Sequence, residues 1–357
     1  MLTYVYKLFL LIAGFAGIGF LIIFHEFGHF IFGKMFGMRI PTFSIGFGPR
    51  LLTKKIGETE FTLSSIPLGG YVDLGTPEGI KEDSRSFVKR PYYQKFLVII
   101  GGISFNILFA YIAFSLLFLF GMPETRILYP ENAISVVDAL EKESAAEKAG
   151  ILPQDTIKSL NNAPIANPAD FFERIKPLAG QQTTLTIERN GKEQDIPITV
   201  GSRTILGQTI GSIGIYFKIV PLAAMPFTTA IQRGAALTNQ FIKGTFLAFK
   251  NLIASRDTSE LAGPLMLFSG SVQFASKGFK IFLIFLAIIS VNLAIMNLIP
   301  LPVFDGGRLL LYTIEAIIRR PLPERVQEYI FIGTWIALIA LTLFMVKQDI
   351  VRMFWGK

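Results

Sequence analysis

The chain has 357 residues, of which 51% are hydrophobic, and it carries a formal net charge of +8. This hydrophobic share is high for a soluble domain and indicates a polytopic membrane protein with a modest soluble part. The absence of cysteine excludes disulfides and thiolate metal sites. Basic residues in cytoplasmic loops explain the positive charge, and without a nucleic-acid motif we expect no nucleic-acid partner.

Four uncharged stretches are long enough to cross a hydrocarbon layer of about 30 Å. They cover residues 8–24, continued through a short polar break to 32, and residues 96–120, 281–304 and 329–346. The first stretch is too long for a cleavable signal peptide, and no small-residue cleavage site follows it. We therefore predict about four transmembrane helices.

Lys and Arg in the short loops predict the orientation of these helices. Residues 34–95 hold ten basic residues and the loop between the third and fourth spans holds four, whereas only Lys7 precedes the first span. Both loops should therefore be cytoplasmic. Both termini and the segment from about 122 to 275 should lie outside the cytoplasm.

The first span ends in His25-Glu26-Phe27-Gly28-His29, which contains both histidines of the chain. Two histidines four positions apart share one face of a helix and can bind the same metal ion. Glu26 follows the first histidine directly and can deprotonate a metal-bound water. The alternative is a chance pair of packed histidines, but ionisable groups inside a span are rare and mostly functional.

Residues 41–76 alternate apolar and smaller side chains, as at Phe43, Ile45 and Phe47, and alternate again over residues 60–66. This pattern is typical of β-hairpins, with a turn at 54–59. The segment is too apolar to be purely solvated, so we expect it to associate with the membrane. Backbone at that depth must be covered by protein or line a wet cavity.

Residues 133–200 have the pattern of a soluble α/β module. Its predicted strands are 134–137, 156–160, 183–188 and 195–200, and its predicted helices are a short one ending at Gly150 and another over 167–175. Asn190-Gly191 is a strong signal for a hairpin turn. Farther along, apolar residues within 226–253 recur at helical spacing and predict an amphipathic helix just outside the membrane.

A catalytic zinc takes three protein ligands and keeps one open position. Without a third histidine or a cysteine, a carboxylate must serve, and Asp305 after the third span is the candidate. The first and third spans run in the same direction, so the histidines and Asp305 should lie at similar depth; the alternative for Asp305 is an interfacial cap. Asn297 could hold the substrate backbone or the developing oxyanion, or could make an interhelical hydrogen bond.

These residues together resemble the site-2 proteases, most closely their bacterial regulator-of-sigma-E protease branch. Residues 25–29 match the first motif of that family, and residues 297–302 leading to Asp305-Gly306-Gly307 match the second. Further similar segments are 66–72 after the β-hairpins, 101–106 on the second span, and Leu261-Ala262-Gly263-Pro264 before the third. Residues 147–157 are similar to the PDZ domains of this branch. The chain has room for one such domain, whereas the enterobacterial members have two in tandem.

The resemblance implies an α-helical polytopic membrane protein with a membrane-associated β-hairpin sheet and an inserted extracytoplasmic α/β PDZ domain. The expected parts are the first half of the protease core at 1–121, the PDZ domain at 122–205, an amphipathic helix region at 206–275, and the second half of the core at 276–357. It further implies a zinc metalloprotease of the bacterial inner membrane, with the active site towards the cytoplasm. Its expected substrates are single-span membrane proteins of the anti-sigma-factor type or remnant signal peptides, cut in regulated intramembrane proteolysis. Other expected partners are membrane lipid and a peptide or protein ligand of the PDZ domain.

A membrane-spanning substrate must be unwound before cleavage, because its helix hides the peptide bonds. An exposed strand edge could pair with the unwound segment, and glycines at Gly69 and Gly70 would let another backbone approach. The full set of predicted substrate-binding residues is Gly69, Gly70, Tyr71, Asn297, Pro300 and Pro302.

Two functions are alternatives to proteolysis. A membrane metal transporter would need no general base such as Glu26. A catalytically inactive PDZ scaffold would need no intact set of catalytic motifs.

Overall fold

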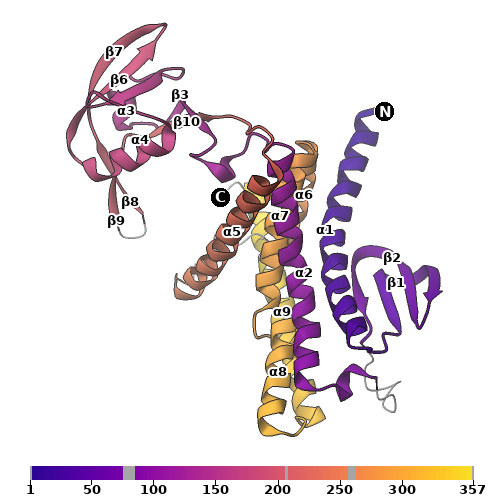
Figure 1. Cartoon of the computed structure of the whole chain (residues 1–357). Helices are drawn as coiled ribbons and strands as arrows, with labels where there is room; N and C mark the ends of the chain where they lie inside the picture. Colours follow the sequence, from indigo (N-terminus) through magenta and orange to yellow (C-terminus); the bar gives the residue numbers. More distant parts are fainter. Residues whose placement is uncertain (1, 75–84, 206–207, 256–262, 356–357) are drawn as a thin grey trace. The chain divides into compact units, whose positions relative to one another are not determined.

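Four helices of the described residues are long and apolar enough to cross a membrane (Figure 1). The computed structural model describes residues 2–74, 85–205, 208–255 and 263–355. The four helices are α1 (Leu2–Met35), α2 (Tyr92–Leu119), α7 (Phe279–Asn297) and α9 (Glu324–Trp355). They confirm the predicted number of apolar helices and belong to one of two units, made of Met1–Leu119 and Pro226–Lys357.

Within this unit α2 packs against both α1 and α7. The approach of α1 to α2 is very close, since a Cβ atom on Gly28 would lie 2.3 Å from the carbonyl oxygen of Gly101. Small residues permit such contacts between apolar helices. On the α7 side, the Ser290 hydroxyl donates a 2.8 Å hydrogen bond to the backbone oxygen of Asn106. The three helices therefore form the packed centre of the unit.

The predicted third span, residues 281–304, is wrong in its length. The helix α7 ends at Asn297, residues 298–304 form a loop, and α8 (Asp305–Ile318) begins a new helix. Pro300 and Pro302 explain the break, because proline lacks an N–H donor and disfavours the helical conformation in the residue before it. Asp305 therefore occupies the first turn of α8.

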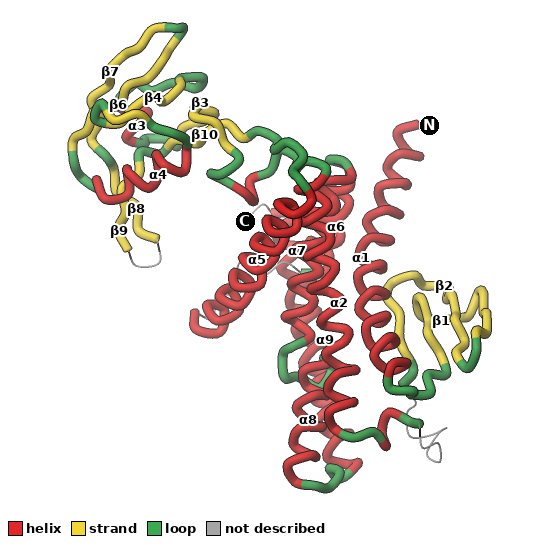
Figure 2. The backbone as a smooth tube through the Cα atoms, viewed as in Figure 1, coloured by secondary structure: helices red, strands yellow, loops and turns green. Residues whose placement is uncertain are grey.

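The predicted β-hairpins are present as β1 (Thr42–Ile56) and β2 (Thr59–Val72), joined at Gly57. Both strands bend back, so that Phe43 is paired with Phe61 on one side and with Val72 on the other. Figure 2 shows these strands beside the end of α1 that carries the histidines, and β2 packs against α1. Residues 75 and 76 of the predicted segment lie outside the described residues.

The predicted amphipathic helix is present as α5 (Phe227–Ser255), which packs against α2 and α7. The rings of Phe114 and Phe241 stack with centroids 5.4 Å apart. The next helix, α6 (Pro264–Ser276), packs against α1, α7 and α9. Of the Gly-Pro element predicted here, Leu261 and Ala262 lie outside the described residues.

The second unit, Phe120–Met225, is built around one antiparallel sheet and two helices. The strand order is β10-β3-β4-β6-β7, with β5 beside β4, and β8 and β9 form a separate hairpin. The strands are β3 (Ala133–Leu140), β4 (Thr156–Leu160), β5 (Ala163–Pro164), β6 (Gln182–Arg189), β7 (Lys192–Thr199), β8 (Gly201–Ile205), β9 (Gln208–Ser212) and β10 (Ile215–Ile219). The helices are α3 (Ala145–Lys148) and α4 (Pro168–Ile175).

Local signals in this unit had the predicted effect. The Asn167 side chain caps α4 by accepting a 2.9 Å hydrogen bond from the Asp170 amide. Asn190 and Gly191 form the turn between β6 and β7 with φ values of 53° and 74°. The predicted end of the domain at residue 205 differs from the observed one, because β10 pairs with β3 and buries Phe217 in the same core. This long-range pairing, together with hydrogen bonds such as that from the Ala146 amide to the Ile213 oxygen, joins residues 208–219 to the unit.

Candidate active site

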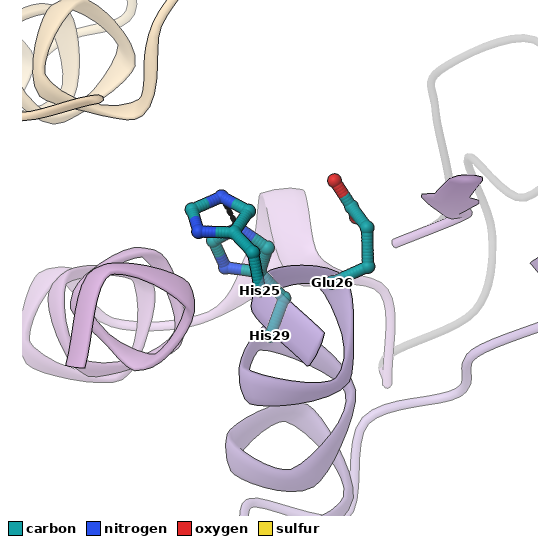
Figure 3. A group of neighbouring side chains, drawn as sticks. All are labelled: His25, Glu26 and His29. Atoms are coloured by element: carbon teal, nitrogen blue, oxygen red, sulfur yellow. Dashed lines mark hydrogen bonds between the residues drawn. The ribbon is translucent and has the colours of Figure 1, made fainter. Parts of the chain in front are cut away.

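The two histidines lie inside α1, which continues for six residues beyond His29. Because they are four residues apart, their imidazole rings share one face of the helix, as Figure 3 shows. The two Nε2 atoms are 3.2 Å apart, and His25 and His29 are 7% and 6% exposed. Two buried imidazole nitrogens thus converge on one point at the interface of α1 with α2.

The Nδ1 nitrogen of His29 makes a hydrogen bond to a backbone carbonyl of α2. Its Nδ1 lies 2.8 Å from the carbonyl oxygen of Val98. A carbonyl can only accept, so Nδ1 carries the hydrogen and Nε2 keeps its lone pair. Such an arrangement is typical of metal-binding histidines. The Nδ1 of His25 lies 3.2 Å from the side-chain amide of Asn106, also on α2.

Glycine on α2 makes the room that the two rings need. A Cβ atom on Gly102 would lie 2.5 Å from Nε2 of His29 and 2.8 Å from Cε1 of His25. Neither ring could keep its position against such an atom. The small-residue segment 101–106 of the second span therefore has a direct part in the shape of the site.

Asp305 joins the two histidines from the start of α8. Its Oδ2 atom lies 3.0 Å from Nε2 of His25 and 3.3 Å from Nε2 of His29, and its side chain is 12% exposed. The helix α8 packs against α2, and Leu309 and Tyr312 contact the apolar cluster at the ends of α1 and α2. This packing brings together residues that are 280 positions apart in the sequence.

The loop before α8 is folded tightly onto the first turn of that helix. A Cβ atom on Gly306 would lie 2.3 Å from the Leu298 oxygen, and one on Gly307 would lie 2.1 Å from the Leu301 carbonyl. Glycine is therefore required at both positions directly after Asp305. The tight loop holds the Asp305 carboxylate against α1.

These three side chains fit a zinc ion. Zinc in tetrahedral sites is held at about 2.0–2.2 Å by His and Asp, which separates ligand atoms by about 3.3 Å. The observed separations are 3.2, 3.0 and 3.3 Å. Among the described residues, the buried Oδ2 of Asp305 has no well-aligned hydrogen-bond partner despite its two close nitrogens. Such an unsatisfied carboxylate oxygen beside two imidazole nitrogens is what a metal ligand set needs.

Glu26 lies next to this cluster on a different side of α1. Its Oε2 accepts a 3.1 Å hydrogen bond from the backbone amide of Val72 in β2, and Figure 3 shows the carboxyl group beside the two rings. Ligand atoms of His25, Glu26 and His29 all lie within 4.8 Å of one another. Asp305 is closer to both Nε2 atoms, so it is the better third ligand, and Glu26 remains available as a base.

The predicted substrate-binding residues fall into two groups. Gly69, Gly70 and Tyr71 lie in β2 directly before Val72, which contacts Glu26. Asn297 is the last residue of α7, and Pro300 and Pro302 lie in the following loop. Among the described residues, Asn297 makes no side-chain hydrogen bond to His25, Glu26, His29 or Asp305. The structure thus brings the predicted ligands together, and Asn297 takes no part in the hydrogen bonds of that cluster among the described residues.

Sequence reasoning missed the contributions of Val98 and Asn106 to the site. The carbonyl of Val98 has no sequence signal, since every residue carries one. Asn106 could have been found, because a buried amide within an apolar span is rare and often functional.

Comparisons with known proteins agree with this geometry. The model of peptidase family M50 matches residues 13–341. A protein of Rhizobium meliloti is 31% identical over 360 residues, covering 92% of this chain and 93% of its own length. One of Clostridium perfringens is 30% identical over 334 residues, covering 93% and 95%. Both carry the name "Putative zinc metalloprotease". The similarity extends over both units of the chain.

Proposed function

Because the chain belongs to peptidase family M50, the site-2 proteases, we propose that it cleaves single-span membrane proteins within the membrane. It is a zinc metalloprotease. The observation that carries the proposal is the approach of Asp305 Oδ2 to within 3.0 and 3.3 Å of the two histidine nitrogens. The histidines lie in an apolar helix and Asp305 follows another, which supports a site reached by membrane-spanning substrates.

The proposed location is the bacterial inner membrane, crossed by α1, α2, α7 and α9. Their length and composition support this placement, and the Lys and Arg counts of the short loops support a position of both termini and the second unit outside the cytoplasm. The active site then lies towards the cytoplasmic side. Exposed Leu51, Leu52 and Ile56 near the turn between β1 and β2 support contact of this sheet with lipid.

His25, His29 and Asp305 would hold the zinc ion. When bound, zinc polarises the scissile carbonyl and activates a water molecule. Glu26 takes a proton from the attacking water and returns it to the nitrogen of the leaving group. The Asn297 amide, which has no side-chain hydrogen-bond partner among the described residues, donates to the developing oxyanion. The peptide bond breaks between carbonyl carbon and nitrogen, and water supplies the hydroxyl group and the proton.

The unwound substrate segment would pair with the edge of β2. Asp73 N–H points to Thr42 of β1, whereas the adjacent Val72 N–H points to Glu26. Since successive N–H groups of a strand alternate in direction, the Gly70–Val72 edge away from β1 faces the catalytic residues. A substrate strand added there would have its peptide bonds beside Glu26.

The second unit is proposed to be a PDZ domain that binds a peptide or protein segment outside the cytoplasm. Its similarity over residues 147–157 and its antiparallel sheet accompanied by two helices support this assignment. Together with the membrane site, it supports a role in regulated intramembrane proteolysis. The proposed substrates are anti-sigma-factor-type proteins already trimmed outside the cytoplasm, or remnant signal peptides.

Proteolysis of a single-span substrate reconstituted with the purified chain tests this function. We expect cleavage within the membrane segment, loss of cleavage with a zinc chelator, and recovery when zinc is restored. A transporter would instead move zinc across the vesicle membrane without cutting the substrate. An inactive scaffold would bind the substrate and leave it intact. Either result would overturn the proposal.

A further inference from the structure

Asn106 is a buried amide in the middle of α2, only 1% exposed. Its side-chain amide lies 3.2 Å from Nδ1 of His25. Its backbone oxygen accepts the 2.8 Å hydrogen bond from Ser290 of α7. The backbone at this position is thereby tied to α7, and the side chain is directed at one ring of the zinc site.

In this orientation, one atom of the Asn106 side-chain amide is unsatisfied. The nitrogen Nδ2 faces His25, while the buried oxygen Oδ1 has no hydrogen-bond partner among the described residues. A buried acceptor without a partner is costly. The oxygen and nitrogen of an amide have nearly the same shape, so their assignment follows from the hydrogen bonds they make.

Zinc binding places a requirement on the same amide. If Nε2 of His25 binds the metal, its neutral ring carries the hydrogen on Nδ1 and needs an acceptor there. A nitrogen donor at that place would force the hydrogen onto Nε2, where it blocks the metal. Rotating the amide by half a turn points Oδ1 at Nδ1, so that the ring gains the acceptor that metal binding through Nε2 requires, and Nδ2 moves to the place that Oδ1 held.

We propose that Asn106 is a positioning residue of the zinc site, whose side-chain oxygen accepts the Nδ1 hydrogen of His25 and so keeps Nε2 free for the metal. Both histidines then donate their Nδ1 hydrogen to an oxygen of α2, because the Val98 carbonyl accepts the Nδ1 hydrogen of His29. The inference rests on the proposed ligand set of His25, His29 and Asp305. It adds that α2, which supplies no ligand, determines how both histidines present their nitrogens.

Three variants of the full-length chain separate this role from simple packing. Asn106→Leu fills the space without an acceptor, whereas Asn106→Asp keeps an acceptor oxygen at the same place. Ser290→Ala removes the link to the Asn106 backbone but leaves its amide untouched, and serves as the matched control. Zinc affinity is measured by competition with a chromophoric chelator in detergent, independently of proteolysis.

We expect Asn106→Leu to bind zinc about 10- to 100-fold more weakly, the range found when such supporting partners of metal ligands are removed. Asn106→Asp and Ser290→Ala should stay within a few-fold of the unaltered chain. Wild-type affinity in Asn106→Leu would overturn the inference. So would equal weakening in the Leu and Asp variants, because that indicates packing alone.

Nitrogen NMR of the imidazoles gives a second readout, which is simple because the chain has only two histidines. With ¹⁵N-labelled histidine in the zinc-loaded protein, both rings should carry their hydrogen on Nδ1 and their metal on Nε2. A His25 ring that binds zinc through Nδ1 would overturn the inference alone. Failure of the unaltered chain to bind zinc, or unchanged binding in Asp305→Ala, would instead overturn the ligand set itself.

Discussion

The backbone amide of Val72 donates a 3.1 Å hydrogen bond to Oε2 of Glu26, which joins the edge of β2 to the helix that carries the histidines. A substrate segment would have to pair with this strand edge and lie beside this carboxylate. Their contact means that a strand pairing at this edge would arrive directly at the proposed base. It also means that substrate would compete with Glu26 for the Val72 amide.

Replacing Glu26 by glutamine should abolish proteolysis while zinc stays bound. An amide of the same shape cannot accept the proton of the attacking water, but it is not one of the three expected ligands. Metal content by elemental analysis and cleavage of a single-span substrate measure the two effects separately. Turnover at the wild-type rate would show that another group is the base.

Asp305→Ala should weaken zinc binding by at least about tenfold, because it removes one of three protein ligands. The two histidines would remain, so residual binding of low affinity is expected. Chelator competition on the purified chain provides the measurement. Glu26→Ala is the matched control, since it also removes a nearby carboxylate. A larger loss of affinity in the control would make Glu26 the third ligand.

Gly102→Ala should reduce zinc affinity and activity together, because the new methyl group would lie 2.5 Å from Nε2 of His29. The rings or the two helices must move apart to accept it. Gly333→Ala on α9 is the control, since a Cβ atom there meets nothing within 4 Å. The control should bind zinc normally. Normal binding in Gly102→Ala would mean that α1 and α2 separate more easily than their packing indicates.

Asp349→Leu should loosen the start of α6. The buried carboxylate of Asp349 on α9 accepts hydrogen bonds from the amides of Gly263, Leu265 and Met266 at 2.9, 3.1 and 3.1 Å. Hydrogen bonds to charged groups contribute about 1.5–3 kcal/mol each, so losing this cap should raise amide hydrogen exchange over the first turn of α6. Asp349→Asn should have a smaller effect. Unchanged exchange in both variants would contradict the capping role.

A single cysteine at Asn190 should be labelled by an impermeant thiol reagent on intact cells. The chain has no cysteine of its own, so the background is clean. The residue lies in the turn between β6 and β7 of the second unit. A cysteine at Arg319, in the loop expected inside the cytoplasm, should react only after the cells are opened. The reverse pattern would invert the proposed topology.

Local patterns determined a large part of this protein. The helix period places His25 and His29 on one face wherever the helix lies, and the lack of any third histidine or cysteine leaves a carboxylate as the remaining zinc ligand. Apolar length identified the four long helices. In the second unit, Asn167 and Asn190-Gly191 act through bonds and backbone angles within a few residues, so their effect is readable from the sequence.

Only the tertiary structure decided how distant segments meet. The approach of Asp305 to α1 depends on the packing of α8 against α2, for which the local sequence has no signal. The same holds for β10, which joins its sheet through pairing with β3. Asn106 is the clearest case, because an amide in an apolar span can serve any neighbour. Its role follows from the ring that the folded chain places 3.2 Å away.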